Sequence, residues 1–121
     1  MNKAKKVVAV FLLAVFLLIS ILYAVYINKQ KNKDEIIYFY GITCPHCKNV
    51  EKFIEENNLD KTLKITKKEV YNNQNNLLEL IKYAEKCGIY DDVGVPFIYY
   101  KGKCYVGEEE SINLLRSIAG D

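Results

Sequence analysis

The first 33 positions of this 121-residue sequence contain no acidic residue, and all 15 acidic residues follow them. Six of the 17 lysine and arginine residues also lie in that stretch. Residues 34–121 therefore hold 11 basic and 15 acidic residues and carry a net charge of −4. Nucleic-acid-binding domains usually present a basic patch or stripe, so we predict no nucleic-acid partner.

Metal ligands are also scarce, because the chain has one histidine and four cysteines. A metal site normally needs four ligands, whereas only Cys44, His46 and Cys47 lie together and the other two cysteines are far away in the sequence. We therefore predict no metal and no cofactor. A module that holds copper or zinc with these three residues is the alternative from a different functional class.

A long apolar run is the clearest feature that is present. Residues 7–27, VVAVFLLAVFLLISILYAVYI, contain no charge and would form a helix of about 31 Å, close to the ~30 Å hydrocarbon thickness of a bilayer. The run predicts a transmembrane anchor after a basic flank, residues 1–6. The alternatives are a buried core helix and a cleaved signal peptide, but a signal peptide ends in small residues, and here Tyr23 and Tyr26 stand at the exit.

The charges that flank this run do not set its orientation, because three lysines precede it and three follow it within a few residues. The polar residues 28–35, NKQKNKDE, predict a short tether. The residues after the tether, 36–121, suffice for one small domain.

The hydrophobic pattern of residues 36–121 predicts alternating strands and helices. We expect strands over 36–40, 63–70, 97–100 and 103–106 and helices over 45–57, 74–87 and 108–119. Lys101 and Gly102 predict a tight hairpin between the last two strands. This order predicts an α/β fold, a mixed sheet with helices on both faces. The cysteine pair falls at the carboxyl end of the first strand, where such sheets usually place their sites.

The spacing of Cys44 and Cys47 favours redox chemistry. If the helix begins at Pro45, the proline occupies the first helical position, where its missing N–H has no cost. Cys44 is then the N-cap, and the free N–H groups and the helix dipole favour its thiolate. We therefore predict that Cys44 is the nucleophile.

Cys47 follows on the side of the helix shared by Val50 and Ile54, so we expect it to be the more buried sulfur. From there it can attack a mixed disulfide on Cys44. His46 can place a ring N–H or a positive charge beside the thiolate. Each of these effects stabilises the reduced state and makes the disulfide a stronger oxidant.

Other uses of the pair fit less well. A structural disulfide across two residues would add little loop-closure stabilisation, and haem attachment needs histidine directly after the second cysteine, where Lys48 stands. A CxxC beside alternating strands and helices is typical of a redox motif.

A second motif, VGVPFIYY at 93–100, places Pro96 at the entrance of a strand. The succession of strand, Cys-Pro-His-Cys at a helix start, strand, helix, and Gly-Val-Pro before a hairpin and a last helix resembles the thioredoxin superfamily over residues 36–118. The resemblance implies a thioredoxin-like domain of glutaredoxin size. It also implies that Val95 and a cis Pro96 pack against the cysteines and offer backbone groups to a substrate chain.

The motif Cys44-Pro45-His46-Cys47 resembles that of the DsbA-type disulfide oxidases. The resemblance implies a thiol-disulfide oxidoreductase that oxidises protein dithiols, with its domain outside the cytoplasm. A membrane-anchored domain of this kind also resembles the redox partners of the quinone-coupled vitamin K epoxide reductase family, which implies a quinone-linked membrane oxidoreductase as partner. A reductase fed from the membrane is the alternative direction of electron flow.

The chain departs from the family pattern at three places. Tyr38 stands where many members have a buried acid, Thr43 replaces a common tryptophan, and the glutamates at 108–110 should repel the carboxylate of glutathione.

The second cysteine pair has two interpretations. Cys87 ends a predicted helix and Cys104 lies on the last strand, opposite Tyr99 if the hairpin loop has two residues. Both residues fit as buried thiols, since free cysteine packs as a small hydrophobe. An oxidising compartment favours instead a structural disulfide between them.

Overall fold

A computed structural model describes residues 2–120, without the side chains of residues 30–33. The chain forms two compact units, Met1–Asn32 and Lys33–Asp121. The first unit is the greater part of one helix, and the second contains the sheet with its helices.

Helix α1 (Asn2–Lys33) contains the apolar run. Its span Asn2–Lys29 is long and apolar enough to cross a membrane, a property that it shares with signal sequences, and its apolar side chains are exposed. No glycine or proline interrupts residues 2–33, which explains why the helix continues past the apolar run. Residues 28–33 of the predicted tether are the last turns of this helix, and the separate role of that segment stays a prediction.

The strands of the second unit form one mixed sheet, as the sequence predicts. Its spatial order is β2-β1-β3-β4, in which β1 runs parallel to β2 and antiparallel to β3. The strands are β1 (Ile36–Tyr40), β2 (Ile65–Glu69), β3 (Phe97–Tyr100) and β4 (Lys103–Val106). Lys101 and Gly102 both have positive φ and close the β3–β4 hairpin, which places Cys104 opposite Tyr99.

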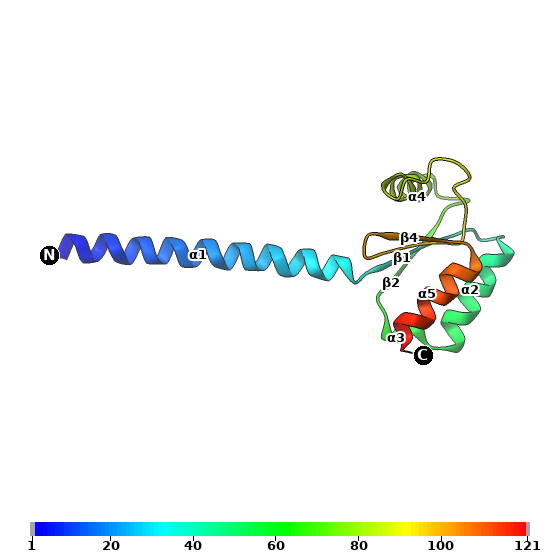
Figure 1. Cartoon of the computed structure of the whole chain (residues 1–121), viewed down its shortest axis with the longest axis horizontal. Helices are drawn as coiled ribbons and strands as arrows, with labels where there is room; N and C mark the ends of the chain where they lie inside the picture. The colour runs from blue at the N-terminus through cyan, green and yellow to red at the C-terminus, as the bar shows by residue number, and fades with distance from the viewer. Residues whose placement is uncertain (1, 121) are drawn as a thin grey trace. The chain divides into compact units, whose positions relative to one another are not determined.

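Helices cover both faces of this sheet, which confirms the α/β prediction (Figure 1). One face packs under α2 (Pro45–Glu56), α3 (Leu59–Thr62) and α5 (Glu108–Ala119), and the other packs under α4 (Gln74–Lys86). The sequence analysis missed α3, since one helical turn is too short to show a hydrophobic period.

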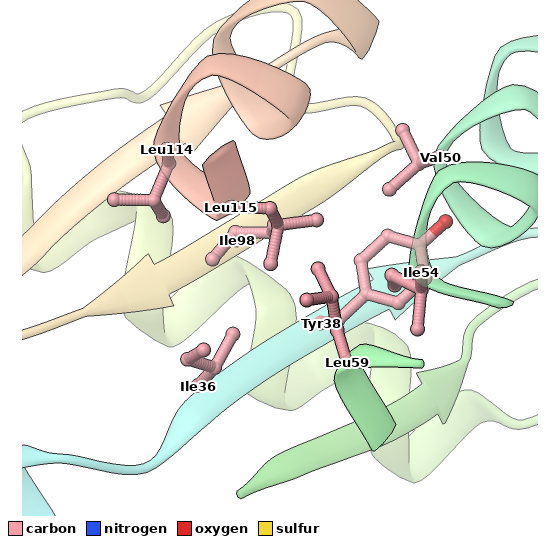
Figure 2. Close-up of a cluster of buried hydrophobic side chains, with 8 residues drawn as sticks. All are labelled: Ile36, Tyr38, Val50, Ile54, Leu59, Ile98, Leu114 and Leu115. Atoms are coloured by element: carbon pink, nitrogen blue, oxygen red, sulfur yellow. The ribbon is translucent and has the colours of Figure 1, made fainter. Parts of the chain in front are cut away.

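The alternation of side chains along β1 explains the two layers. Tyr38 and Phe39 are both fully buried and point to opposite faces. Figure 2 shows Tyr38 in the larger cluster, between the sheet and α2, together with Ile98 from β3 and Leu115 from α5. Phe39 contacts Phe97 edge-on in the second cluster, under α4.

The α4 layer is thinner than the α2–α5 layer. Of the apolar residues of α4, Leu80 and Ala84 are buried, whereas Leu77 and Ile81 keep more than a third of their surface exposed. A disulfide joins Cys87, the C-cap of α4, to Cys104 of β4, with 6.2 Å between the two Cα atoms. Closing a loop of this length stabilises a fold by about 3 kcal/mol, so the bridge supplements the small contact area of α4.

Two leucines of α4 test this packing. Leu80 is 1% exposed and Leu78 is 51% exposed. Leu80→Ala should lower the free energy of unfolding by about 2–5 kcal/mol because it leaves a cavity, whereas Leu78→Ala should change it by less than about 0.5 kcal/mol. Urea denaturation of the full-length protein in detergent, followed by circular dichroism, measures both. Equal losses for the two variants would contradict the packing of α4.

Candidate redox-active site

The residues after β1 place two sulfurs at the N-terminus of α2. Cys44 has extended backbone angles (φ −76°, ψ 115°) and caps the helix, with Pro45 as the first helical residue. The backbone N–H of Cys47 donates to the Sγ of Cys44 over 3.2 Å. Cys44 and Cys47 form a disulfide, with 5.2 Å between their Cα atoms. The helix therefore begins where the spacing of the motif predicts, and Cys44 lies at its positive end.

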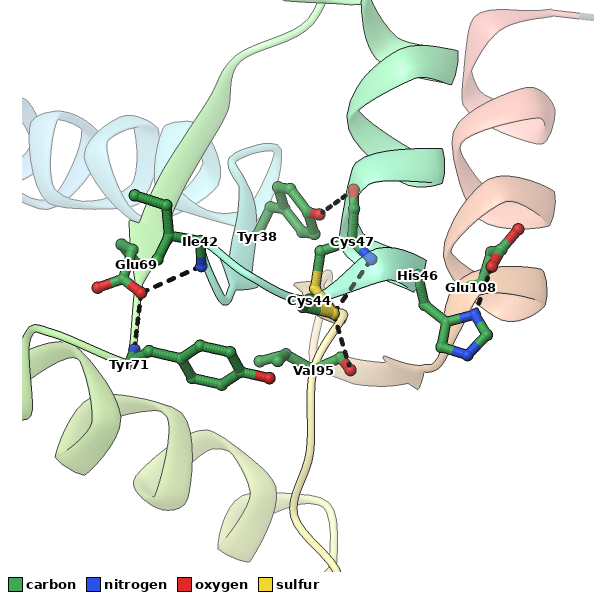
Figure 3. Close-up of a disulfide and its surroundings, with 9 residues drawn as sticks. All are labelled: Tyr38, Ile42, Cys44, His46, Cys47, Glu69, Tyr71, Val95 and Glu108. Carbon is green, nitrogen blue, oxygen red and sulfur yellow. Dashed lines mark hydrogen bonds and ion pairs between the residues drawn. A yellow bond between two sulfur atoms is a disulfide. The ribbon is translucent and has the colours of Figure 1, made fainter.

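The two sulfurs differ in access to solvent. Cys44 is 5% exposed and Cys47 is 1% exposed, and Cys47 shares the buried side of α2 with Val50 and Ile54. In Figure 3 the Cys44–Cys47 disulfide lies between the N-terminal end of α2 and the loop that carries Val95. Both cysteines are thus buried, and Cys44 is the slightly more exposed of the two.

The structure brings Val95 and Pro96 beside the disulfide, although 51 residues separate Val95 from Cys44 in the chain. The Val95–Pro96 peptide bond is cis, and the carbonyl oxygen of Val95 lies 3.7 Å from the Sγ of Cys44. The carbonyl oxygen of Pro96 accepts a hydrogen bond from the N–H of Gly107 over 2.8 Å. This bond ties the proline to the N-terminus of α5.

His46 makes a contact that the sequence analysis did not anticipate. Its Nδ1 lies 2.6 Å from Oε2 of Glu108, at the start of α5, and its side chain is 71% exposed. Asn49 donates to the other carboxylate oxygen of Glu108 over 3.0 Å. Hydrogen bonds from His46 and Asn49 lower the pKa of the Glu108 carboxyl. Figure 3 shows the ring turned toward Glu108, not toward the sulfur of Cys44.

Tyr38 occupies the position under the disulfide where the resemblance would suggest an acid. Its side chain is fully buried, and its hydroxyl donates to the carbonyl oxygen of Cys47 over 3.2 Å. Burial raises the pKa of the Tyr38 hydroxyl, so the group stays protonated at neutral pH. Tyr38 therefore fixes the backbone of Cys47 as a neutral donor and does not accept a proton.

Glu69 organises the loop before Cys44 and was missed from the sequence. At the end of β2, its Oε1 accepts the N–H of Tyr71 over 2.8 Å and of Ile42 over 3.3 Å, while Oε2 accepts the N–H of Asn72 over 2.8 Å. Burial raises the pKa of Glu69, but these hydrogen bonds outweigh it and hold that pKa below its usual value. The one sign in the sequence is a glutamate near the end of a predicted strand. Its hydrogen bond to Ile42 could not be predicted, because it depends on the pairing of β1 with β2.

The ring of Tyr71 packs closely against the backbone at Gly41, where no side chain is in the way. A Cβ at Gly41 would lie 2.3 Å from the ring of Tyr71. A larger residue would therefore displace either the ring or the loop that leads to Cys44.

Two hollows flank the Val95–Pro96 segment. One, of about 610 Å³, runs along α5 and is lined by residues that include His46, Pro96, Glu108 and Arg116. The other, of about 450 Å³, lies between α4 and the loop before Pro96, with Tyr71, Leu77, Leu80, Val93 and Val95 in its lining. Both hollows contact Val95.

Within residues 2–120, no group of three or more histidine, cysteine, aspartate or glutamate side chains is placed to hold a metal ion. The geometry thus gives no support to the copper or zinc alternative.

In comparisons with known proteins, no family model and no curated protein matches this chain. The function of the chain is therefore inferred from the geometry of the site.

The hydrogen bonds of Glu69 make a pH-dependent contribution to stability. Because the folded-state pKa of Glu69 is lowered, this contribution is present above the unfolded pKa and is lost as the pH falls through the folded pKa. Glu69→Gln should lower the melting temperature at pH 7, and its difference from the wild type should shrink under acidic conditions. Thermal melts between pH 7 and pH 3 measure this, with the exposed Glu56→Gln as control. A difference independent of pH would contradict the role of the charge.

Proposed function

We propose that the chain is a membrane-anchored thiol-disulfide oxidoreductase with a thioredoxin-like domain that oxidises protein dithiols outside the cytoplasm. The observation that carries this proposal is the Cys44–Cys47 disulfide at the N-terminus of α2, with the carbonyl of Val95 3.7 Å from the Cys44 sulfur. A pair of cysteines at disulfide distance is compatible with reversible oxidation, and the helix N-terminus gives the two sulfurs unequal roles.

The first step is attack of a substrate thiolate on the Sγ of Cys44, the more exposed sulfur. The Cys44–Cys47 bond breaks, a mixed disulfide forms between the substrate and Cys44, and Cys47 leaves as a thiolate that takes up a proton. A second substrate thiolate then attacks the substrate sulfur of the mixed disulfide. Cys44 leaves with the electron pair, so the substrate has lost two electrons and the protein has gained them.

The departure of Cys44 is the step that the helix assists. Its sulfur already accepts the N–H of Cys47 over 3.2 Å, and a negative charge at this position interacts favourably with the helix dipole. The reduced state is thereby stabilised relative to the disulfide, which makes the disulfide a better oxidant.

Val95 and Pro96 are the proposed contact for the substrate chain. The cis bond and the hydrogen bond from Gly107 to Pro96 hold the Val95 carbonyl beside Cys44. An extended segment that pairs with the backbone at Val95 would carry its own cysteine to the Cys44 sulfur, as the thioredoxin resemblance implies.

The length and apolarity of α1 support anchoring in a membrane through residues 7–27. The Cys87–Cys104 disulfide supports an oxidising compartment, because cytosolic proteins rarely keep structural disulfides. Protein thiols are then the substrates, and a quinone-linked membrane oxidoreductase is the proposed acceptor of the electrons.

The opposite direction of electron flow has one observation in its favour. Nδ1 of His46 is engaged by Glu108, so the imidazole gives the Cys44 thiolate less help than the sequence suggests. A smaller stabilisation of the reduced state would make the pair less oxidising. The second candidate is therefore an extracytoplasmic disulfide reductase that uses the same two cysteines.

The two cysteines should have separable roles. Cys44→Ser should abolish oxidation of a dithiol peptide, because it removes the attacked sulfur. Cys47→Ser cannot form the internal disulfide, and a mixed disulfide placed on its Cys44 should persist because no second thiol resolves it. Alkylation at mildly acidic pH followed by mass spectrometry should label Cys44 of the reduced wild type before Cys47. Residual peptide oxidation by Cys44→Ser would contradict the assignment.

The reduction potential decides the direction of electron flow. Equilibration of the full-length protein in detergent with glutathione buffers, followed by alkylation and mass spectrometry, measures it for Cys44–Cys47 alone. We expect a value toward about −120 mV, the oxidising end of this protein class. A value near about −270 mV would instead support the reductase.

A further inference from the structure

The Cys87–Cys104 disulfide fastens the last turn of α4 to the β3–β4 hairpin. Cys87 is the C-cap of α4, and Cys104 faces Tyr99 across the hairpin. The sulfur of Cys104 lies 3.4 Å from the carbonyl oxygen of Tyr83, whose ring packs against Tyr99 with 4.3 Å between centroids. The bridge therefore joins the helix and the hairpin where their side chains already meet.

This bridge does not exchange directly with the Cys44–Cys47 disulfide. Cys104 pairs with Tyr99 across the hairpin, and Tyr99 in turn pairs with Ile37 near the start of β1. Cys44 lies beyond the other end of β1, and the three steps along the strand from Ile37 to Tyr40 alone span about 10 Å. Direct exchange requires contact between sulfurs, so the second bridge acts through the fold.

The segment that follows Cys87 connects the second disulfide to the candidate redox-active site. The loop from Gly88 to Val95 directly follows Cys87, and its last residue lies beside the Cys44 sulfur. Its start is fixed by a hydrogen bond from the N–H of Ile89 to the carbonyl of Ala84 over 2.9 Å.

The middle of this loop has little support of its own. In the part of the chain that the structure describes, no backbone–backbone hydrogen bond involves residues 90–94. Tyr90, Asp91 and Asp92 are exposed, and Val93 and Val95 rest against the cluster under α4. Between the hydrogen bonds at Ile89 and Pro96, the loop is therefore held by side-chain packing against the cluster under α4.

We propose that the Cys87–Cys104 disulfide is a positioning device for substrate binding, because it holds α4 and the following loop in the arrangement that presents Val95 to Cys44. The hollow of about 450 Å³ has Leu77 and Leu80 of α4 on one side and Val93 and Val95 of the loop on the other. The bridge joins the C-terminal end of α4, and with it the start of the loop, to β4. This inference rests on the proposed function, in which a polypeptide substrate lies along Val95.

The physical effect is preorganisation. A loop that is ordered before binding loses little freedom when a substrate chain pairs with it, whereas a loose loop must be ordered at that moment. Loss of the bridge should therefore slow reaction with a polypeptide, which uses Val95. It should not slow reaction with a small dithiol, which needs only the sulfur of Cys44.

The test compares two reductants of the oxidised full-length protein in detergent. One is dithiothreitol and the other is an unstructured ten-residue peptide with two cysteines; either one gives two electrons to the Cys44–Cys47 disulfide and becomes a disulfide itself. Acid quench, alkylation and mass spectrometry give both rate constants for this pair. In Cys87→Ala/Cys104→Ala the ratio of the peptide to the dithiothreitol rate constant should fall about tenfold, with an unchanged Cys44–Cys47 potential.

A second variant keeps the bridge intact and loosens only the loop. Two glycines inserted between the exposed Tyr90 and Asp91 should lower the same ratio. Two glycines inserted between Lys101 and Gly102, in the hairpin turn, are the matched insertion and should leave it unchanged. Leu59→Ala, which weakens the opposite layer of the domain, controls for loss of stability alone.

The outcomes are distinct. An unchanged ratio in the bridge variant would overturn the positioning role whatever the loop insertion does, and the disulfide would be structural only. An equal fall in Leu59→Ala would overturn it too, because general destabilisation would then explain the effect. Absence of reaction of the wild type with the peptide and with dithiothreitol would overturn the proposed function first, and this inference with it.

Discussion

The site depends on one short interaction, the hydrogen bond from the backbone N–H of Cys47 to the sulfur of Cys44 at the start of α2. It exists because Pro45 begins the helix and leaves Cys44 as the cap. The helix is in turn fixed against β1, since Val50 and Ile54 pack over Tyr38. The buried core thus determines where the free N–H groups point, and these groups make one sulfur a good leaving group.

Three segments that are distant in the sequence hold the surroundings of this helix end. The carboxylate of Glu69 collects backbone N–H groups from the loop before Cys44 and from the turn after β2. The carbonyl of Val95 reaches the sulfur from the other side. Glu108 connects α5 to α2 through His46. Each contact joins segments that meet at the same edge of the sheet, so the strand order decides which residues meet there.

The two faces of the domain are packed unequally, and the proposed substrate contact at Val95 lies on the thinner side. Three helices cover the face that contains Tyr38, whereas α4 covers the other face with few fully buried side chains. The Cys87–Cys104 bridge lies on the thinner side and precedes the loop that carries Val95. A covalent bond is an effective way to fix an element whose apolar contact area is small.

The sequence by itself determined the strands, the main helices and the cap at Cys44, because these follow from hydrophobic periods and from the local geometry of proline. It also indicated an α1 that is long and apolar enough to cross a membrane. Only the tertiary structure decided that His46 turns to Glu108, that Glu69 holds Ile42, and that Cys87 reaches Cys104. The reason is physical, since these contacts join residues 17 or more positions apart, and their distances follow from strand pairing and helix packing, which no local pattern encodes.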